Sequence, residues 1–126
     1  MRIVLVLFLM AVALFSEHIR WQSDFDKALF EAKKEKKEIL LLVLKKESAE
    51  CKDIFTEVFG DKEVQEEVNR KYIAVVAFFE HKNSYPIELF YTQNFPTLFF
   101  ASNRDESYLQ KPLRGCFTKD ELLKAL

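Results

Sequence analysis

The chain has 126 residues, and its 19 lysine and arginine residues are balanced by 20 aspartate and glutamate residues, for a net charge of −1. Because there is no surplus of basic residues to hold a phosphate backbone, a nucleic-acid partner is not expected. The sequence contains 13 phenylalanines but only 2 glycines and 3 prolines. This composition argues against a disordered chain and favours one densely packed domain.

The first sixteen residues have the pattern of a secretory signal peptide. Arg2 supplies a positive charge, residues 3–15 form an unbroken apolar run, and Ser16 is a small residue suited to cleavage. This run is long enough for a signal peptide, whereas a membrane-spanning helix needs roughly 20 residues. We expect residues 1–16 to be removed and residues 17–126 to form a periplasmic or secreted domain without stable membrane insertion. An uncleaved anchor and a buried N-terminal helix are the alternatives.

Apolar periodicity predicts the first helix and the first strand of this domain. Residues 23–26, Ser-Asp-Phe-Asp, have the pattern of a capping box, which opens a helix. The apolar stripe of this helix consists of Phe25, Ala28, Leu29 and Ala32. The short apolar run at residues 39–44 is flanked by charge, so it predicts a strand covered on both faces, as in a parallel sheet.

A second helix is predicted to start near Ser48. Its apolar stripe consists of Cys51, Ile54, Phe55 and Val58. Residues 60–61 interrupt the pattern, and a further helical segment continues to about residue 69. The apolar run at residues 72–79 then predicts the second strand.

The last part of the chain predicts a hairpin and a closing helix. Residues 86–92 are expected to form a short helix, and residues 97–101 a strand. A turn at residues 102–105 is short enough to make residues 107–113 an antiparallel partner strand. A capping box at residues 118–121 opens the last helix. Strands alternating with helices, followed by a hairpin, predict an α/β sandwich with a mixed sheet.

Several motifs resemble the thioredoxin-like superfamily. They are residues 51–59 (CKDIFTEVF), Asn69 with Tyr72, residues 95–100 (FPTLFF), and Gly115. In this order, over residues 21–126, the chain is similar to exported thioredoxin-related proteins and to the C-terminal domain of the transmembrane thiol:disulfide interchange protein. The resemblance implies a thioredoxin-like three-layer sandwich, in which helices flank a central mixed sheet.

The resemblance places the catalytic positions at Ser48 and Cys51. The family has a C-x-x-C site at a helix N-terminus, where the first thiolate attacks a disulfide and the second cysteine resolves the mixed disulfide. Ser48 stands where that first cysteine is found, and oxygen cannot form the mixed disulfide. Ser48 also suits an N-cap that accepts from the backbone N–H of Cys51, a bond worth about 1 kcal/mol. Cys51 is either a small buried apolar residue or a single redox-active thiol.

Two further residues depart from the family's pattern. Glu47 precedes Ser48, where the family typically has an aromatic residue, and its charge opposes thiolate formation nearby. Leu42 stands where the family commonly has an acidic residue for proton transfer. Both departures weaken the case for dithiol chemistry.

The resemblance also implies a substrate groove. Pro96 is similar to the cis-proline of the fold, with Phe95 and Thr97 beside it, and Gly115 and Cys116 are expected to border the same groove. An X–Pro bond favours trans by only about 0.5–1 kcal/mol, and the alternative is an ordinary trans proline at a strand start. Cys116 is a packing residue, an independent exposed thiol, or the partner of Cys51 in an unorthodox redox couple. Such a pair needs Cα atoms within roughly 4.4–6.8 Å.

These residues predict an exported thioredoxin-family protein with a degenerate S-x-x-C site. We expect weak or absent dithiol oxidoreductase activity and a retained groove for a protein or peptide, including partners that carry thiols. The alternative is a thiol–disulfide oxidoreductase or isomerase that uses Cys51 alone or with Cys116, so the sequence leaves open whether the protein is an enzyme. A serine introduced to trap intermediates would be an odd choice, because the first cysteine forms the mixed disulfide. No cofactor is expected, the histidines and cysteines lack metal-ligand spacing, and we expect a monomer.

Overall fold

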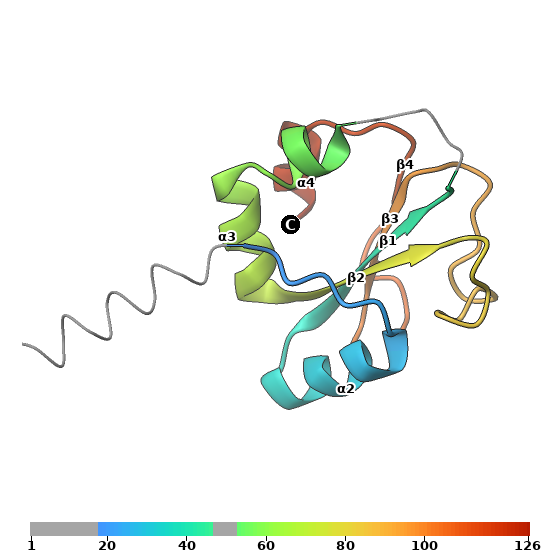
Figure 1. Ribbon diagram of the computed structural model, residues 1–126. Helices are drawn as coiled ribbons and strands as arrows, with labels where there is room; N and C mark the ends of the chain where they lie inside the picture. Colours follow the sequence, from blue (N-terminus) through green and yellow to red (C-terminus); the bar gives the residue numbers. More distant parts are fainter. Residues whose placement is uncertain (1–17, 47–52) are drawn as a thin grey trace, which may run out of the picture.

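A four-stranded mixed sheet, in the order β2-β1-β3-β4, forms the centre of the structure (Figure 1). The computed structural model describes residues 18–46 and 53–126. β1 (Glu38–Leu44) pairs in parallel with β2 (Tyr72–Phe78) and antiparallel with β3 (Thr97–Ala101). β3 in turn pairs antiparallel with β4 (Leu113–Arg114). The expected mixed sheet is therefore confirmed.

The N-terminal part of the domain extends the sheet beyond β2. The backbone N–H of Gln22 donates to the carbonyl oxygen of Ala74 at 2.8 Å, and the N–H of Val76 donates to the carbonyl oxygen of Gln22 at 2.9 Å. These two bonds form an isolated parallel bridge between Gln22 and Val75. They protect the outer edge of β2, which would otherwise expose unpaired backbone groups.

Helices cover both faces of the sheet (Figure 1). α2 (Phe25–Glu35) packs on one face. The other face is covered by α3 (Lys62–Lys71), α4 (Lys119–Ala125) and the π-helical turn η1 (Ile54–Val58). Within the described ranges, no helix is long and apolar enough to cross a bilayer.

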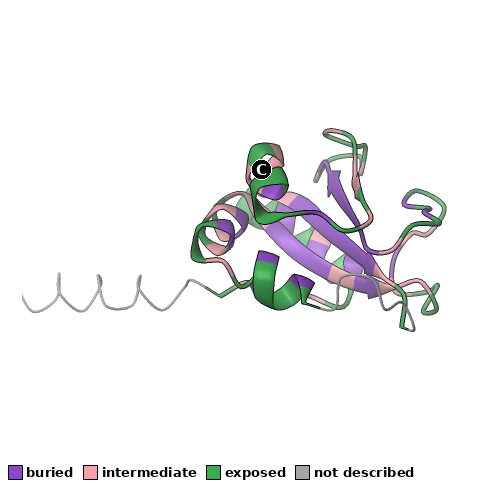
Figure 2. Cartoon of the chain, turned by 90° about the horizontal axis from the view of Figure 1, so that it is seen from above, coloured by how far each residue is buried: buried purple, intermediate pink, exposed green. Residues whose placement is uncertain are grey.

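The central strand β1 divides the core into two layers. Ile39, Leu41 and Val43 pack toward α2, whereas Leu40 and Leu42 pack toward α3 and α4. This follows from the strand period of two, which sends successive side chains to opposite faces. All five residues are completely buried, and Figure 2 shows the strands buried and the outer sides of the helices exposed. A strand covered on both faces reads as an unbroken apolar run, as the sequence indicated.

Polar side chains cap three helices. Asp24, rather than Ser23, is the N-cap of α2, and its carboxylate accepts from the backbone N–H of Lys27 at 3.2 Å. The predicted helix is confirmed, but its first residue is Phe25. The capping box at Thr118 and Glu121 is confirmed at the start of α4. Asp61 caps α3 and thereby ends the interruption that the sequence indicated at residues 60–61.

The predicted short helix at residues 86–92 was wrong, because this segment forms consecutive turns. The backbone N–H groups of Leu89 and Phe90 both donate to the carbonyl oxygen of Pro86, at 3.0 and 3.2 Å. Phe90 is fully buried, with its ring 5.6 Å from that of Phe25. A helix this short is marginal in water, so burial of Phe90 decides the path of the chain.

The predicted strand at residues 107–113 was largely wrong as well. Only a single bridge joins Tyr108 to Ala101, and β4 contains two residues. Pro112 lies directly before β4 and has no backbone N–H to donate to β3. The pairing with β3 is therefore interrupted at Pro112 and occurs only before and after it. The Tyr108 hydroxyl donates to the carbonyl oxygen of Leu89 at 2.8 Å, so this segment fixes the preceding loop rather than the sheet.

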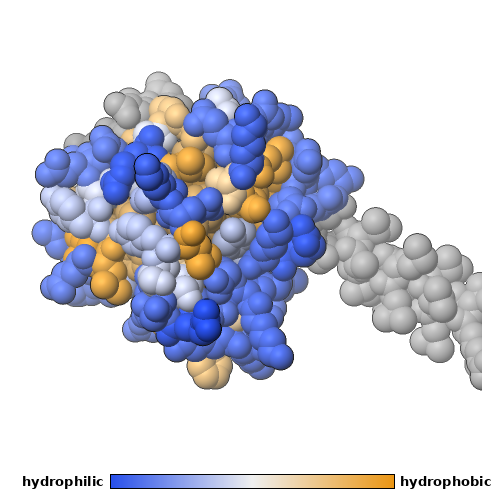
Figure 3. Space-filling model, turned by 180° about the vertical axis from the view of Figure 1, so that it is seen from behind, coloured by the Kyte–Doolittle hydropathy of each residue, from blue (hydrophilic) through white to orange (hydrophobic). Residues whose placement is uncertain are grey.

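Apolar side chains reach the surface in several places, and Figure 3 shows them breaking a largely polar face seen from behind. Among the described residues, the large exposed apolar side chains are Phe30, Phe55, Leu89, Tyr91, Tyr108 and Leu109. Phe30 lies on α2 and Phe55 on η1, whereas the other four lie on two loop segments that the hydrogen bond from Tyr108 to Leu89 joins. Single apolar residues at a protein surface are normal.

Candidate functional site

The Phe95-Pro96-Thr97 segment and the Gly115-Cys116 segment lie side by side at one end of the sheet. The backbone N–H of Gly115 donates to the carbonyl oxygen of Pro96 at 2.8 Å, next to the β3–β4 pair of Thr97 with Arg114. The Phe95–Pro96 peptide bond is cis, and Gly115 has a φ of 77°. Pairing of β3 with β4 therefore brings together two motifs that are separated by seventeen residues of sequence.

The side chain of Thr97 is fully buried and engaged within the protein. Its hydroxyl donates to the carbonyl oxygen of Asn94 at 2.6 Å and lies 2.9 Å from the hydroxyl of Thr92. Arg114 Nη1 donates to the Thr92 hydroxyl at 2.9 Å. These hydrogen bonds hold the loop before Pro96 against β4.

Phe95 is half-buried beside the proline. Its ring centroid lies 5.2 Å from that of Phe79, and Lys45 Nζ lies 5.8 Å from the Phe95 ring centroid. Pro96 itself is buried. Phe95 is thus the side chain of this segment that still offers apolar surface to a bound molecule.

Cys116 is exposed and disulfide-bonded. It borders a cavity of about 480 Å³ whose apolar part comes from Ile54 and Val58 of η1 and from Phe117. η1 is a single π-helical turn, in which the N–H of Phe59 donates to the carbonyl oxygen of Ile54 at 3.0 Å. Turns of this kind are frequent at functional sites.

Carboxylates dominate the rim of this cavity. The exposed residues Asp53 and Glu57 line it, while Nζ of the nearby Lys119 lies 3.3 Å from Asp61 Oδ1. Asp61 also accepts the backbone N–H of Val64 at 3.1 Å. The Val64 bond, followed by the contact with Lys119, holds the pKa of the Asp61 carboxyl below its ordinary value.

Two predicted site residues, Ser48 and Cys51, lie outside the described residues, as does Glu47. Leu42, which stands where the family has an acidic residue, is fully buried in the apolar layer under α3 and α4. Phe95, Pro96, Thr97, Gly115 and Cys116 are brought together by the β3–β4 pairing.

The sequence analysis missed several residues of this region. Thr92 is buried and polar, and it links Thr97 to Arg114, although no motif marks it. Asp53 and Glu57 lie in the predicted helical segment, and no motif indicated that they line a cavity together with Cys116. Their four-residue spacing, which places two side chains on the same side of a helix, was the one available signal.

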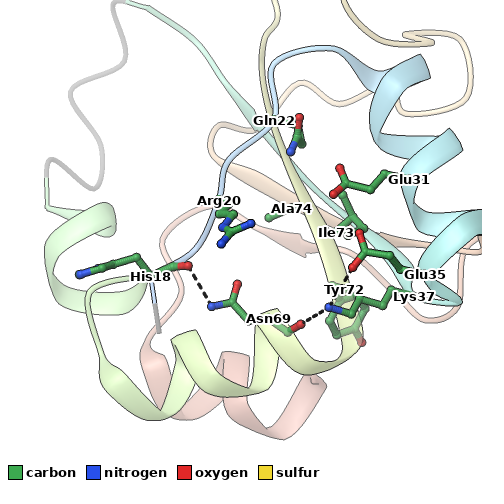
Figure 4. Close-up of a pocket in the computed structure, with 10 residues that line it drawn as sticks. All are labelled: His18, Arg20, Gln22, Glu31, Glu35, Lys37, Asn69, Tyr72, Ile73 and Ala74. Carbon is green, nitrogen blue, oxygen red and sulfur yellow. Dashed lines mark hydrogen bonds and ion pairs between the residues drawn. The ribbon is translucent and has the colours of Figure 1, made fainter. Parts of the chain in front are cut away.

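A second cleft, of about 250 Å³, lies between the N-terminal segment 18–22, α2, the end of α3 and the start of β2 (Figure 4). Lys37 Nζ donates to the carbonyl oxygen of Asn69 at 2.7 Å, and Asn69 donates to the carbonyl oxygen of His18 at 2.9 Å. A hydrogen bond with Glu35, together with burial and the charge of Glu35, raises the pKa of Glu31. The cleft contains none of the predicted site residues, and the part of the chain that the structure describes holds no cluster of metal-ligating side chains.

Comparison with known proteins places this geometry in context. Residues 20–102 match the family model described as thioredoxin-like. A thioredoxin from Thermus thermophilus is similar with a TM-score of 0.73 and 16% identity, over 85% of this chain and 83% of that one. The DsbH oxidoreductase is similar with a TM-score of 0.72 and 14% identity, over 89% of this chain and 84% of that one.

A further solved structure extends the comparison. The C-terminal domain of DsbD from Neisseria meningitidis, in its oxidised form, has a TM-score of 0.64 and 18% identity over 84% of this chain and 96% of that one. No curated protein sequence matches the chain. At these identities the structural likeness establishes the fold, which confirms the sandwich expected from the sequence.

Proposed function

The chain belongs to the thioredoxin-like family, and we propose that it is an exported member that binds a protein or peptide through the groove around Phe95, Pro96, Thr97, Gly115 and Cys116. The observation that carries this proposal is the hydrogen bond from the backbone N–H of Gly115 to the carbonyl oxygen of Pro96, which joins the two motifs. Beside this pair lie the half-buried ring of Phe95 and the cavity at Cys116. An apolar anchor next to a cavity is a typical binding arrangement.

Dithiol turnover is weak or absent in this proposal because Ser48 occupies the position of the family's first cysteine. A serine hydroxyl cannot form the mixed disulfide on which reduction depends. Reduction of insulin by the purified protein, with dithiothreitol as electron donor, is expected to stay near the background rate. Robust turnover would refute this part of the proposal.

Binding can be tested with an unfolded probe protein, fluorescently labelled reduced and alkylated ribonuclease. Phe95→Ala should weaken probe binding at least severalfold, because it removes the anchor, while circular dichroism remains that of the wild type. Phe30→Ala is the matched control, since Phe30 is an aromatic residue on α2 that is 72% exposed. Equal binding by the wild type and Phe95→Ala would exclude the groove.

A second candidate function is thiol–disulfide exchange, and the disulfide at Cys116 favours it. The sequence contains 2 cysteines, so we propose Cys51 as the partner of Cys116. Cys116 is exposed, and an accessible disulfide can be attacked by an external thiolate. Titration with glutathione redox buffers should break and re-form this disulfide reversibly, and the mass of the alkylated protein measures the fraction reduced. A disulfide that resists reduction until the protein unfolds would be structural only.

Export rests on the pattern of residues 1–16. Expression of the full chain in a bacterium, followed by fractionation, should yield a periplasmic or secreted protein whose intact mass corresponds to residues 17–126. Retention of an uncleaved chain in the membrane fraction would favour an anchor instead.

A further inference from the structure

We infer that the cavity beside Cys116 selects thiols that carry positive charge, so that its preferred partner presents basic residues next to a cysteine. This inference rests on the disulfide exchange proposed above. The walls of the cavity combine the exposed, disulfide-bonded residue Cys116 with an apolar floor and a rim that contains two carboxylates. η1 and the start of α4, which supply these walls, lie together on the same side of the sheet (Figure 1).

The floor of the cavity can hold the uncharged part of a side chain. Ile54, Val58 and Phe117 are buried, with 6%, 5% and 6% of their surface exposed. They line the cavity beside Cys116. Lysine and arginine side chains pack their methylene groups along apolar surface and keep the charged end in water. An apolar floor with a polar rim is therefore suited to them.

Among the residues that the structure describes, the rim of the cavity holds two carboxylates and one ammonium group, that of Lys119. Asp53 and Glu57 form no ion pair with any residue in the ranges 18–46 and 53–126, and both are exposed. Lys119 is the one cation among the described residues that line the cavity, and its Nζ already lies 3.3 Å from Asp61 Oδ1. Because the ammonium group of Lys119 is already paired with Asp61, the two carboxylates dominate the described part of the rim. An excess of one sign of charge in a cleft raises the local concentration of ligands of the opposite sign.

The rate of the exchange reaction depends on the charge of the rim, so kinetics can test it. A partner thiolate attacks the sulfur of Cys116 and forms a mixed disulfide, while the original S–S bond breaks and its electron pair leaves on the other cysteine as a thiolate. A second partner thiolate then attacks the mixed disulfide, releasing Cys116 as a thiolate and the partner as its own disulfide. Two electrons pass from two partner thiols to the protein. Each attacking group is an anion, so the rim slows every thiolate unless nearby basic residues offset the repulsion.

The experiment compares two capped peptides, acetyl-Lys-Cys-Lys-amide and acetyl-Glu-Cys-Glu-amide, as reductants of the oxidised full domain. Rate constants are divided by the thiolate fraction of each peptide and by its rate with hydroxyethyl disulfide, a neutral reference. We expect the lysine peptide to react about 5-fold to 50-fold faster in low salt, within the range of electrostatic rate effects. The ratio should fall toward 1 in 1 M NaCl, where the screening length is about 3 Å.

Two double variants test whether the carboxylates of the rim cause the difference in rate between the peptides. Asp53→Asn/Glu57→Gln should reduce the low-salt ratio severalfold, mainly by accelerating the glutamate peptide. Asp26→Asn/Glu66→Gln is the matched control, because it removes the same two charges from exposed positions on α2 and α3 and should leave the ratio unchanged.

The outcomes separate this inference from the proposal on which it rests. Equal normalised rates for the two peptides, or a ratio unaffected by Asp53→Asn/Glu57→Gln, would overturn the charge selectivity and leave exchange intact. If neither peptide reduces the folded protein but both reduce it in urea, the exchange proposal itself fails and the selectivity fails with it.

Discussion

Lys119, the first residue of α4, places its Nζ 3.3 Å from Oδ1 of Asp61, the residue that caps α3. One carboxylate thus caps α3 and also pairs with α4, which packs on the same face of the sheet. Both interactions favour the ionised carboxyl, because a helix N-terminus and an ammonium group each attract negative charge.

Asp61→Ala should lower the melting temperature by several degrees at pH 6. The folded-state pKa of Asp61 lies below its ordinary value of 3.8, so the stability it contributes is present above that value and is lost as the pH falls through the folded pKa. The difference between variant and wild type should therefore shrink at pH 3 and below. Thermal melts by circular dichroism across this range provide the measurement.

Asp61→Asn separates the two roles of this residue, since asparagine also caps a helix but carries no charge. It should melt between the wild type and Asp61→Ala at pH 6. A difference between Asp61→Ala and the wild type that stays constant down to pH 2 would contradict the assignment.

Gly60→Ala should destabilise the protein by about 1–3 kcal/mol, the usual cost of forcing extra volume into packed structure. A Cβ atom at this position would lie 2.3 Å from the carbonyl oxygen of Thr56 in η1, so the backbone must shift. Urea unfolding monitored by fluorescence of Trp21, which packs 5.0 Å from the ring of Phe59, reports the change near this turn. A variant as stable as the wild type would show that η1 adapts without cost.

Gly115→Ala provides a contrast, because no atom lies within 4 Å of its added Cβ and only its φ of 77° opposes an L side chain. The left-handed conformation costs roughly 1–2 kcal/mol for residues other than glycine. Gly115→Asn should lose less, since asparagine tolerates this region. Equal losses for alanine and asparagine, measured by urea unfolding, would argue against backbone strain as the cause.

Thr92 and Thr97 are expected to be energetically coupled. Their hydroxyl oxygens lie 2.9 Å apart, and Thr97 is fully buried. Removing either hydroxyl breaks the hydrogen bond between them, so this loss is counted twice in the sum of the single variants but only once in the double variant. In urea unfolding, Thr92→Val/Thr97→Val should therefore cost less than the sum of the single variants by about 0.5–1.5 kcal/mol. Additive losses would show that the pair contributes nothing beyond packing.

Glu31→Gln should raise the melting temperature at pH 7 and change it little at pH 4. Its hydrogen bond with Glu35 favours the protonated form and raises the pKa of Glu31 above its ordinary value of 4.5. The corresponding stability is fully present below that value and is lost as the pH rises through the folded-state pKa. Thermal melts from pH 3 to pH 8 test this.

Glu66→Gln is the control for this prediction, because Glu66 is an exposed carboxylate on α3 outside the cleft that contains Glu31. It should show no comparable change between pH 4 and pH 7. A gain at pH 7 that is equal in Glu31→Gln and Glu66→Gln would point to overall charge rather than to the Glu31–Glu35 contact.

The secondary structure that the sequence predicted well is the part that local patterns specify. The apolar run at residues 39–44 matched β1, and residues 97–101 matched β3. Segments whose path depends on distant contacts were predicted poorly. Phe90 is held between the rings of Phe25 and Phe99, and Tyr108 stacks on Phe90 with centroids 5.9 Å apart. Neither contact leaves a periodic trace in the sequence.

Motifs and apolar periodicity alone determined the class of fold, the capping box of α4 and the residues of the proline loop, because each depends on neighbours within a few positions of the chain. The tertiary structure decided what surrounds Cys116. Asp53, Glu57 and Phe117 meet there only because η1 and the turn before α4 cover the same face of the sheet. Such a meeting depends on packing between elements far apart in sequence, which no local pattern encodes.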